Sequence, residues 1–428
     1  MTSIPALLHR LRSGVLTLQG YLDELETRFE QVEPEILAFV PEEGRFERLR
    51  RDAALLSDRF PDPATRPPLF GLPIGVKDIF HVDGFVTRAG SRLPPESMQG
   101  PEAECVTTLK HAGALVLGKT ATTEFAYFAP GPTRNPRNPD HTPGGSSSGS
   151  AAAVAAGLCP FALGTQTIGS INRPAAFCGV VGFKPTYGRI ATGGIIPLSP
   201  SLDHAGFFTA DTASAELMAA HLCHGWRARP SPNRKPVLAV PVGVYLEQAD
   251  PEGLAQFRSD CDRLTAAGFA IKQPDAFLDF EEIRRCHLVL MAAEAARVHA
   301  AWFEASESLY HPRTAGLIRE GRACSEKDIA AARAKQIEVR SRLDRLMAEQ
   351  AIDVWLSPPA KGSAPRGLES TGDPVMNLPW TNAGLPTLTL PTGSNADGLP
   401  LGLQLTGRRE EDEMLFGHAQ LIEQALTG

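Results

Sequence analysis

The sequence contains few cysteines and shows no strong imbalance of charge. Its 428 residues include seven cysteines, which are widely spaced and form no CxxC pair. An odd number of scattered cysteines argues against a disulfide framework or a zinc site and is typical of a reducing compartment. The net charge of -7 indicates neither a nucleic acid nor an anionic membrane surface as a partner. We therefore expect a cytoplasmic protein without a metal site.

Long apolar runs are also absent. No stretch approaches the roughly 20 apolar residues of a membrane-spanning helix. The opening residues, MTSIPALLHRLRSG, lack the apolar segment of a signal peptide. Hydrophobic residues make up 43% of the chain and charged residues 21%, which is ordinary for a globular protein with a large core. The sequence thus predicts no membrane partner.

What the chain does contain is a run of small residues, GGSSSGS at 144–150, followed by the helix-forming string AAAVAAG. Seven small residues cannot fill a core, but they suit a place where backbone comes close to other groups. A second such place is GTQTIGSI at 164–171, and the short apolar run GLPIGVKD at 71–78 carries one lysine, Lys77. A lysine and two serines beside glycines, Ser146 and Ser170, are the parts of a hydroxyl nucleophile with a basic relay.

These strings resemble the amidase signature family of serine hydrolases. The resemblance extends to ALGTQTIGSINRPAAFCGVVGFKPTYGRI, and to NLPWTNAGLPTLTLPTG and GLPLGLQLTG near the end. It is close over residues 70–210 and looser from about residue 350 onward. Strands alternate with helices in the pattern, which predicts a parallel or mixed sheet covered on both faces. We expect an α/β fold with three α/β/α layers around a central mixed sheet, with helical additions and no cofactor.

We expect the whole chain, 1–428, to form a single amidase domain with four regions. Residues 1–60 form a helical N-terminal wrap, and residues 61–210 form the catalytic signature core. Residues 211–350 are a variable helical region that includes an Arg/Pro-rich linker at 225–235 and helices predicted over 251–268, 279–310 and 325–350. Residues 351–428 complete the core sheet, and a strand is also predicted over 237–244.

The resemblance implies that Ser170 is the nucleophile and that Ser146, preceded by a cis peptide bond, bridges it to Lys77. A serine hydroxyl is too weakly acidic to attack an amide unaided, so it needs a proton acceptor. A lysine in an apolar setting has a lowered pKa and can serve as a neutral base. The same relay can return a proton to the leaving amine. The developing oxyanion would be held by the backbone N–H groups of Thr167, Ile168, Gly169 and Ser170.

Two positions depart from the commonest family pattern, in which an Asp and an Arg form a supporting ion pair. Here the positions hold Gln166 and Asn172, whose amides can still hydrogen-bond each other. An arginine follows one place later, at Arg173, and the same arrangement occurs in malonamidase-like members. The resemblance implies that Arg173 holds the carboxylate of an acidic substrate. The alternative is that Arg173 pairs with a structural Asp or Glu.

Ile168 stands where the family usually has glycine or another small residue. It predicts a normal φ at this position and a small acyl pocket. Further pocket residues come from the Pro-rich loop after residue 126, where a packed surface loop is the alternative, and from the C-terminal motif; the candidates are Tyr127, Phe128, Arg134, Trp380, Thr381 and Asn382. Asp203 is expected to be a structural hydrogen-bonding residue. His204 allows a Ser-His-Asp arrangement, which the lysine relay makes unnecessary.

Together these features predict an amidase that hydrolyses the C–N bond of a small amide, through an acyl-enzyme and with release of ammonia or an amine. The preferred substrate carries a carboxylate. The alternatives are a neutral aliphatic, aryl or urea-derived amide, the glutaminase-type subunit of an amidotransferase, or a non-catalytic scaffold. The expected partner is the small-molecule amide itself, and a homodimer is left open.

Overall fold

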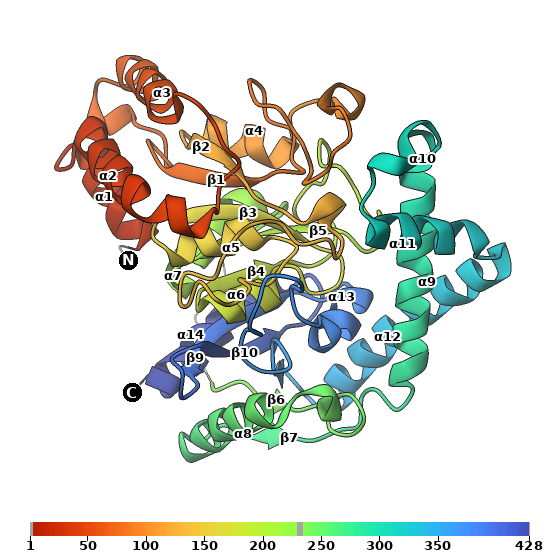
Figure 1. Cartoon of the computed structure of the whole chain (residues 1–428). Coiled ribbons are helices and arrows are strands. Elements are labelled where there is room, and N and C mark those ends of the chain that lie inside the picture. The colour runs from red at the N-terminus through yellow and green to blue at the C-terminus, as the bar shows by residue number, and fades with distance from the viewer. Residues whose placement is uncertain (1–2, 229–233, 428) are drawn as a thin grey trace.

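A mixed ten-stranded sheet runs through the part of the chain that the computed structural model describes, residues 3–228 and 234–427 (Figure 1). Its strand order is β2-β1-β3-β5-β4-β9-β10-β8-β6-β7. The strands are β1 (Pro73–Lys77), β2 (Leu115–Thr120), β3 (Phe161–Gln166), β4 (Val181–Lys184), β5 (His204–Thr209), β6 (Leu238–Ala239), β7 (Ile271–Lys272), β8 (Val354–Ser357), β9 (Thr387–Ser394) and β10 (Pro400–Thr406).

Parallel pairing occurs at both ends of the sheet and antiparallel pairing in its middle. Strand β1 pairs in parallel with β2 and β3, while β6 pairs in parallel with β7 and β8. Strands β3, β5, β4, β9, β10 and β8 are joined by antiparallel ladders. The predicted mixed sheet is confirmed. The strand expected over 237–244 is much shorter, since β6 ends before Pro241, which has no N–H to donate to a ladder.

Helices cover both faces of this sheet and give the three layers that the sequence predicts. The first three are α1 (Ile4–Ser13), α2 (Leu18–Ile36) and α3 (Arg45–Arg59). The others are α4 (Glu104–His111), α5 (Ser148–Ala155), α6 (Asn172–Cys178), α7 (Thr212–Leu222), α8 (Pro251–Ala266), α9 (Phe280–Val298), α10 (Ala300–Ser306), α11 (Pro312–Ala323), α12 (Glu326–Glu349), α13 (Leu378–Ala383) and α14 (Asp412–Thr427). Helices α5 and α6 pack on each other, as do α7 and α14.

The region predicted to be a helical N-terminal wrap is helical but interrupted twice. The side chains of Ser3 and Thr17 accept backbone N–H groups at the starts of α1 and α2, and Gly14 ends α1 in the left-handed conformation. Helix α1 packs against α7, and α3 packs against β2. These helices therefore cover one end of the sheet (Figure 1).

Helices α9, α11 and α12 form a second helical group (Figure 1). The helix predicted over 279–310 is wrong in its length, because α9 ends at Val298 and His299 separates it from α10. Pro312 then begins α11, which the sequence pattern did not predict. Residues 229–233 of the predicted linker lie outside the described residues. None of the helices in the described ranges is long and apolar enough to cross a membrane.

The hydrophobic side chains form a main core around the sheet and a second core around α9, α12 and α13. Ala126 and Ile171 belong to the main core, whereas Ile168 and Leu198 belong to the second. The loop from Thr167 to Ile171 therefore lies where the two cores meet. Since this loop carries the predicted nucleophile, both hydrophobic cores border the candidate active site.

Candidate active site

The predicted relay begins at the carboxyl ends of two neighbouring parallel strands. Lys77 is the last residue of β1, and Thr165 and Gln166 are the last two residues of β3. The two strands pair in register, with Val76 opposite Leu163. Carboxyl ends of parallel strands meet at one edge of a sheet, where α/β proteins commonly bind ligands. This pairing therefore brings the loop after β3 next to the lysine.

Lys77 is completely buried and surrounded by hydroxyl groups. Its Nζ lies 2.7 Å from Ser146 Oγ, 2.7 Å from Thr165 Oγ1 and 3.0 Å from Ser147 Oγ. Burial lowers the pKa of the Lys77 ammonium well below its usual range, and the charge of Asp203 offsets part of this effect. The surroundings therefore favour a neutral amine at this position.

The hydrogen bonds around Lys77 indicate where the lone pair of a neutral amine would point. Ser147 Oγ donates its own proton to the carbonyl of Thr165 at 3.2 Å, so it can only accept from Lys77. A neutral amine has two N–H groups, and Ser147 and Thr165 can accept both. The lone pair would then face Ser146, which can donate its hydroxyl proton to Lys77. This is the arrangement a general base requires.

Ser146 follows a cis peptide bond to Gly145, as the family resemblance implies. Ser146 and Ser170 both line a cavity of about 10 Å³, which we call the serine chamber. This volume is about enough for one water molecule. Its lining comprises Ala126, Tyr127, Phe128, Ser146, Thr167, Ile168, Ser170, Arg173, Leu198, Met291 and Pro374. The chamber is thus narrow and is lined by both predicted relay serines.

The backbone N–H groups predicted to hold the oxyanion have no backbone acceptor in the described ranges. Among the described residues, Thr167, Ile168, Gly169 and Ser170 donate no backbone hydrogen bond to a protein acceptor. Ile168 has a normal, negative φ, as the sequence predicts. The Thr167 side chain is held by Asp203, whose Oδ1 accepts from its Oγ1 at 2.5 Å. These donors are available to a developing negative charge.

The neutral pair Gln166 and Asn172 makes the predicted hydrogen bond, from Gln166 Nε2 to Asn172 Oδ1 at 2.9 Å. Gln166 Oε1 also accepts the backbone N–H groups of Ile171 and Asn172, at 2.8 and 3.0 Å. Thr381 accepts from Gln166 and donates to the carbonyl of Ile168 at 2.6 Å. The amide pair therefore fixes the turn that carries Ser170 without any buried charge.

Arg173 borders the serine chamber and is only 1% exposed. Its Nη2 donates to the carbonyl of Gly145 at 2.6 Å and to Thr371 Oγ1 at 3.2 Å. Its Nε and Nη1 have no hydrogen-bond partner in the described chain. Burial lowers the pKa of Arg173 to about 10, with Asp373 acting in the opposite direction, so the guanidinium stays charged at neutral pH. Within the described ranges no Asp or Glu forms an ion pair with Arg173, and Asp373 acts on it only through its charge.

The chain matches known proteins along nearly its whole length. The model of the family described as Amidase matches residues 22–416. The chain belongs to the Amidase family. Among its relatives, a glutamyl-tRNA(Gln) amidotransferase subunit from Synechococcus sp. (strain WH7803) is 33% identical, over 97% of this chain and 95% of that protein. The chain is therefore an amidase-family enzyme acting on C–N bonds, with the family's mixed α/β fold.

Solved structures agree with this assignment. One described as a crystal structure of amidase superposes with a TM-score of 0.89 at 31% identity and covers 99% of both chains. A peptide amidase in complex with the competitive inhibitor chymostatin superposes with a TM-score of 0.83 at 26% identity, over 100% of this chain and 98% of the other. The amidase fold therefore extends over the whole described chain.

Two further serines of the amidase signature support the loops. Ser148 Oγ donates to the carbonyl of Gly144, and Ser150 Oγ donates to the carbonyl of Leu163, both at 2.8 Å. Asp203 has the predicted structural role as well, since its Oδ2 accepts the N–H groups of Leu198 and Ser199 at 2.8 and 2.9 Å. These bonds fix the loops on either side of the lysine.

Several predicted pocket residues do not reach the chamber. Trp380 is completely buried in the second core, where its indole N–H donates to the Tyr245 hydroxyl at 2.9 Å. The side chains of Thr381 and Asn382 are buried: Thr381 contacts the Ser170 loop and Asn382 lies beside His287. Arg134 bonds the carbonyl of Pro139. The reason is that α13 turns the Trp380 indole into the second core, where it packs against Tyr245 and Phe277. Tyr127 and Phe128, by contrast, do line the chamber.

His204 takes no part in a Ser-His-Asp arrangement. Its Nδ1 lies 2.7 Å from the carbonyl of Leu202, its Nε2 has no partner among the described residues, and its ring packs edge-on against Tyr187. Burial lowers the pKa of His204 well below its usual range. The relay that the geometry supports therefore contains lysine rather than histidine.

Four chamber residues, Ala126, Leu198, Met291 and Pro374, were not predicted from the sequence. Met291 lies on α9 and Pro374 precedes α13, so both arrive from regions distant in sequence. Ala126 and its neighbour Phe125 adopt positive φ values of 60° and 47°. No sequence pattern marks these positions, because each reaches the chamber through tertiary packing.

Proposed function

We propose that this amidase hydrolyses a small amide that carries a carboxylate, with Ser170 as the nucleophile. In the first half-reaction Ser170 Oγ attacks the amide carbonyl carbon, and its proton passes to Ser146 while Ser146 gives its own to neutral Lys77. The oxyanion is stabilised by the free N–H groups of residues 167–170. The relay then runs in reverse and protonates the nitrogen, the C–N bond breaks, and ammonia or an amine leaves.

In the second half-reaction water takes the place of the amine. It loses a proton through Ser146 to Lys77 and attacks the ester carbon of the acyl-enzyme. The bond to Ser170 Oγ breaks, and the relay returns the proton to that oxygen. The products are a carboxylic acid and ammonia or an amine, and the enzyme regains its starting protonation state.

The surroundings of Arg173 support a substrate that carries a carboxylate. It is a buried cation on the wall of the serine chamber with two unpartnered nitrogen groups. Leaving such a group without an anion is costly, so a substrate carboxylate that pairs with it would gain a strong charge-assisted contact. The small volume of the chamber also favours a short acyl group.

The proposal is tested by measuring ammonia release from matched pairs of small amides. One member of each pair has a free carboxylate and the other has none. We expect the purified protein to prefer the carboxylated member of each pair. In Arg173→Gln the ratio of kcat/KM for the carboxylated and neutral members should fall by about 100-fold, because a charge-assisted contact is lost. Arg409→Gln, an exposed arginine away from the chamber, is the matched control. Preference for neutral amides in the unmodified enzyme would contradict the proposal.

A glutaminase-type subunit of an amidotransferase is the second candidate. The Synechococcus relative carries an amidotransferase name and matches along nearly the whole chain. Such a protein would release ammonia from glutamine and pass it to a partner protein. The two candidates are distinguished by measuring ammonia release by the chain alone, from glutamine and from other small amides. Substantial activity on other small amides without any partner favours the first proposal.

A further inference from the structure

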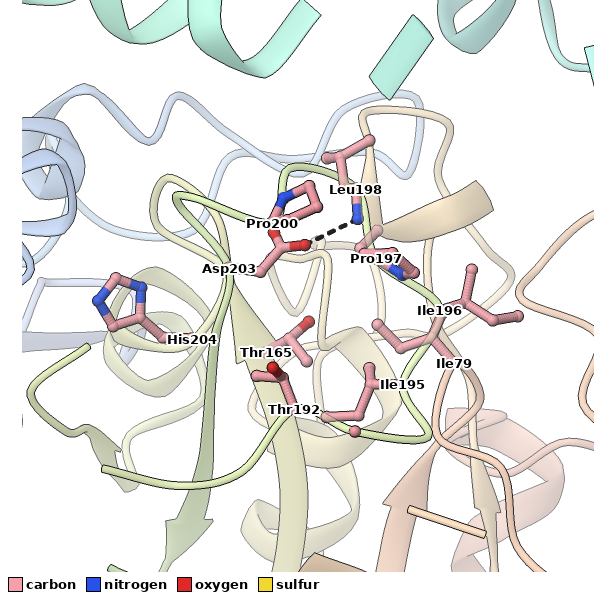
Figure 2. Close-up of a pocket in the computed structure, with 12 residues that line it drawn as sticks. Ile79, Thr165, Thr192, Ile195, Ile196, Pro197, Leu198, Pro200, Asp203 and His204 are labelled. Atoms are coloured by element: carbon pink, nitrogen blue, oxygen red, sulfur yellow. Dashed lines mark hydrogen bonds between the residues drawn. The ribbon is translucent and has the colours of Figure 1, made fainter. Parts of the chain in front are cut away.

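A second cavity lies beside the relay and takes no part in the mechanism above. Its volume is about 230 Å³, compared with about 10 Å³ for the serine chamber. Figure 2 shows its walls, which come from Ile79 after β1, from Thr165 on β3 and from the loop at 192–200. Ile195, Ile196, Pro197 and Leu198 make most of that loop's surface apolar. We call it the lysine-side cavity.

The lysine-side cavity is next to the serine chamber. Ala126 and Leu198 line both, so these two side chains form the shared wall. Thr165, which lines the cavity, is also the residue whose hydroxyl lies 2.7 Å from Lys77 Nζ. The lysine-side cavity therefore adjoins the relay next to Lys77, while the serine chamber lies next to Arg173.

We infer that the lysine-side cavity receives an apolar substituent on the nitrogen of the substrate amide. The inference rests on the proposed function and adds the amine half of the substrate to it. The leaving nitrogen must face Ser146 and Lys77 to be protonated, so a substituent on that nitrogen would extend toward this cavity. The serine chamber is too small to hold this substituent. The substrate class is thus a secondary amide with a short acidic acyl group and an apolar amine.

The walls indicate a neutral occupant of about the size of a benzyl group. An apolar cavity of about 150 Å³ is known to hold benzene, and this one is larger. The one carboxylate on its wall, Asp203, already accepts hydrogen bonds from Thr167, Leu198 and Ser199. Both of its oxygens are therefore already engaged in hydrogen bonds within the protein. When the C–N bond breaks, the nitrogen takes its proton from Ser146 and leaves as a primary amine.

The test compares the primary amide of a short dicarboxylic half-acid with its N-benzyl analogue. The unmodified enzyme should cleave both. In Ile195→Trp, which fills the cavity from a half-buried position, the ratio of kcat/KM for the N-benzyl and primary amides should fall by about tenfold. Leu278→Trp, at an exposed position outside the cavity, should leave the ratio unchanged.

A second measurement does not depend on catalysis. Benzyl alcohol should raise the Tm of the unmodified protein and should not raise that of Ile195→Trp. If the primary amide is cleaved and the N-benzyl amide is not, the inference is overturned while the proposed function stands. If neither amide is cleaved, the proposed function fails, and the Tm measurement alone then decides whether the cavity binds an apolar group. An equal Tm shift in both proteins would overturn the inference even if Ile195→Trp folds poorly.

Discussion

At the scale of single residues, the proposed chemistry depends on burying a lysine among hydroxyl groups instead of carboxylates. Three oxygens surround Lys77 Nζ, and none belongs to an acidic side chain. A carboxylate in contact would favour the ammonium form and make the lysine a poor base. Asp203 acts on the lysine only at longer range, because its oxygens bond to Thr167 and to backbone N–H groups. In the proposed mechanism, burial therefore sets the strength of Lys77 as a base.

The pH dependence of the rate follows from this burial. Because the pKa of Lys77 is lowered, the active neutral amine is retained to lower pH than for an exposed lysine. We expect kcat/KM to be constant at high pH and to fall as pH decreases through the lowered pKa. Lys77→Met should lose about a thousandfold in kcat and should lose this limb of the profile. A pH–rate profile measured on both proteins checks this, and an identical limb in Lys77→Met would assign it to another group.

At the scale of elements, the site is built where strands end and small residues begin. Strands β1 and β3 place Lys77 and Thr165 at one edge of the sheet, and α5 approaches that edge closely because its side chains are small. A Cβ on Gly149 would lie 2.1 Å from the carbonyl oxygen of Ala38 and 2.4 Å from the backbone nitrogen of Ala121. The run of small residues therefore serves close backbone packing as well as the relay.

This packing predicts opposite effects for two glycine substitutions. Gly149→Ala should lower the free energy of unfolding by about 3 kcal/mol, because the added methyl group meets backbone atoms that cannot move aside. Gly316→Ala, inside α11 with open space around it, should raise that free energy by about 0.5–1 kcal/mol through helix propensity. Chemical denaturation of both variants measures the difference. Equal changes in the free energy of unfolding would show that the added methyl group at position 149 does not clash with Ala38 and Ala121.

The turn between β3 and α6 depends on the neutral amide pair. Gln166→Leu keeps the approximate volume but removes the acceptor of two backbone N–H groups and the donor to Asn172. We expect a loss of about 3 kcal/mol in the free energy of unfolding, since buried polar groups lose their partners. Gln19→Leu, on an exposed face of α2, should change it by less than about 0.5 kcal/mol. A loss in Gln166→Leu no larger than in this control would contradict the account of the turn.

At the scale of the whole molecule, the sequence predicted what is local and missed what depends on packing. The mixed sheet, the position of Lys77 at the end of a strand, and the Gln166–Asn172 bond could be predicted, because each follows from a continuous string or a short spacing. The pattern did not indicate α11 or the two-residue strand β7, since these lack a clear period, and it made the strand that became β6 too long. Trp380 is an example of a residue whose position depends on packing.

The string around Trp380 is adjacent to the site, but only the packing of α13 decides that its indole enters the second core. In the same way, α9 contributes Met291 to the chamber from a region without a recognisable motif. Residues that arrive from distant elements cannot be predicted from spacing, since their position depends on how two cores meet.

The central claim is that Ser170 is the nucleophile and that Lys77 activates it through Ser146. The most direct measurement is the rate and site of labelling by a fluorophosphonate, followed by mass spectrometry of the peptides. The account predicts one adduct, on Ser170, that is absent in Ser170→Ala and forms at least about 100-fold more slowly in Lys77→Met. An adduct on a different residue, or an undiminished rate in Lys77→Met, would contradict the account.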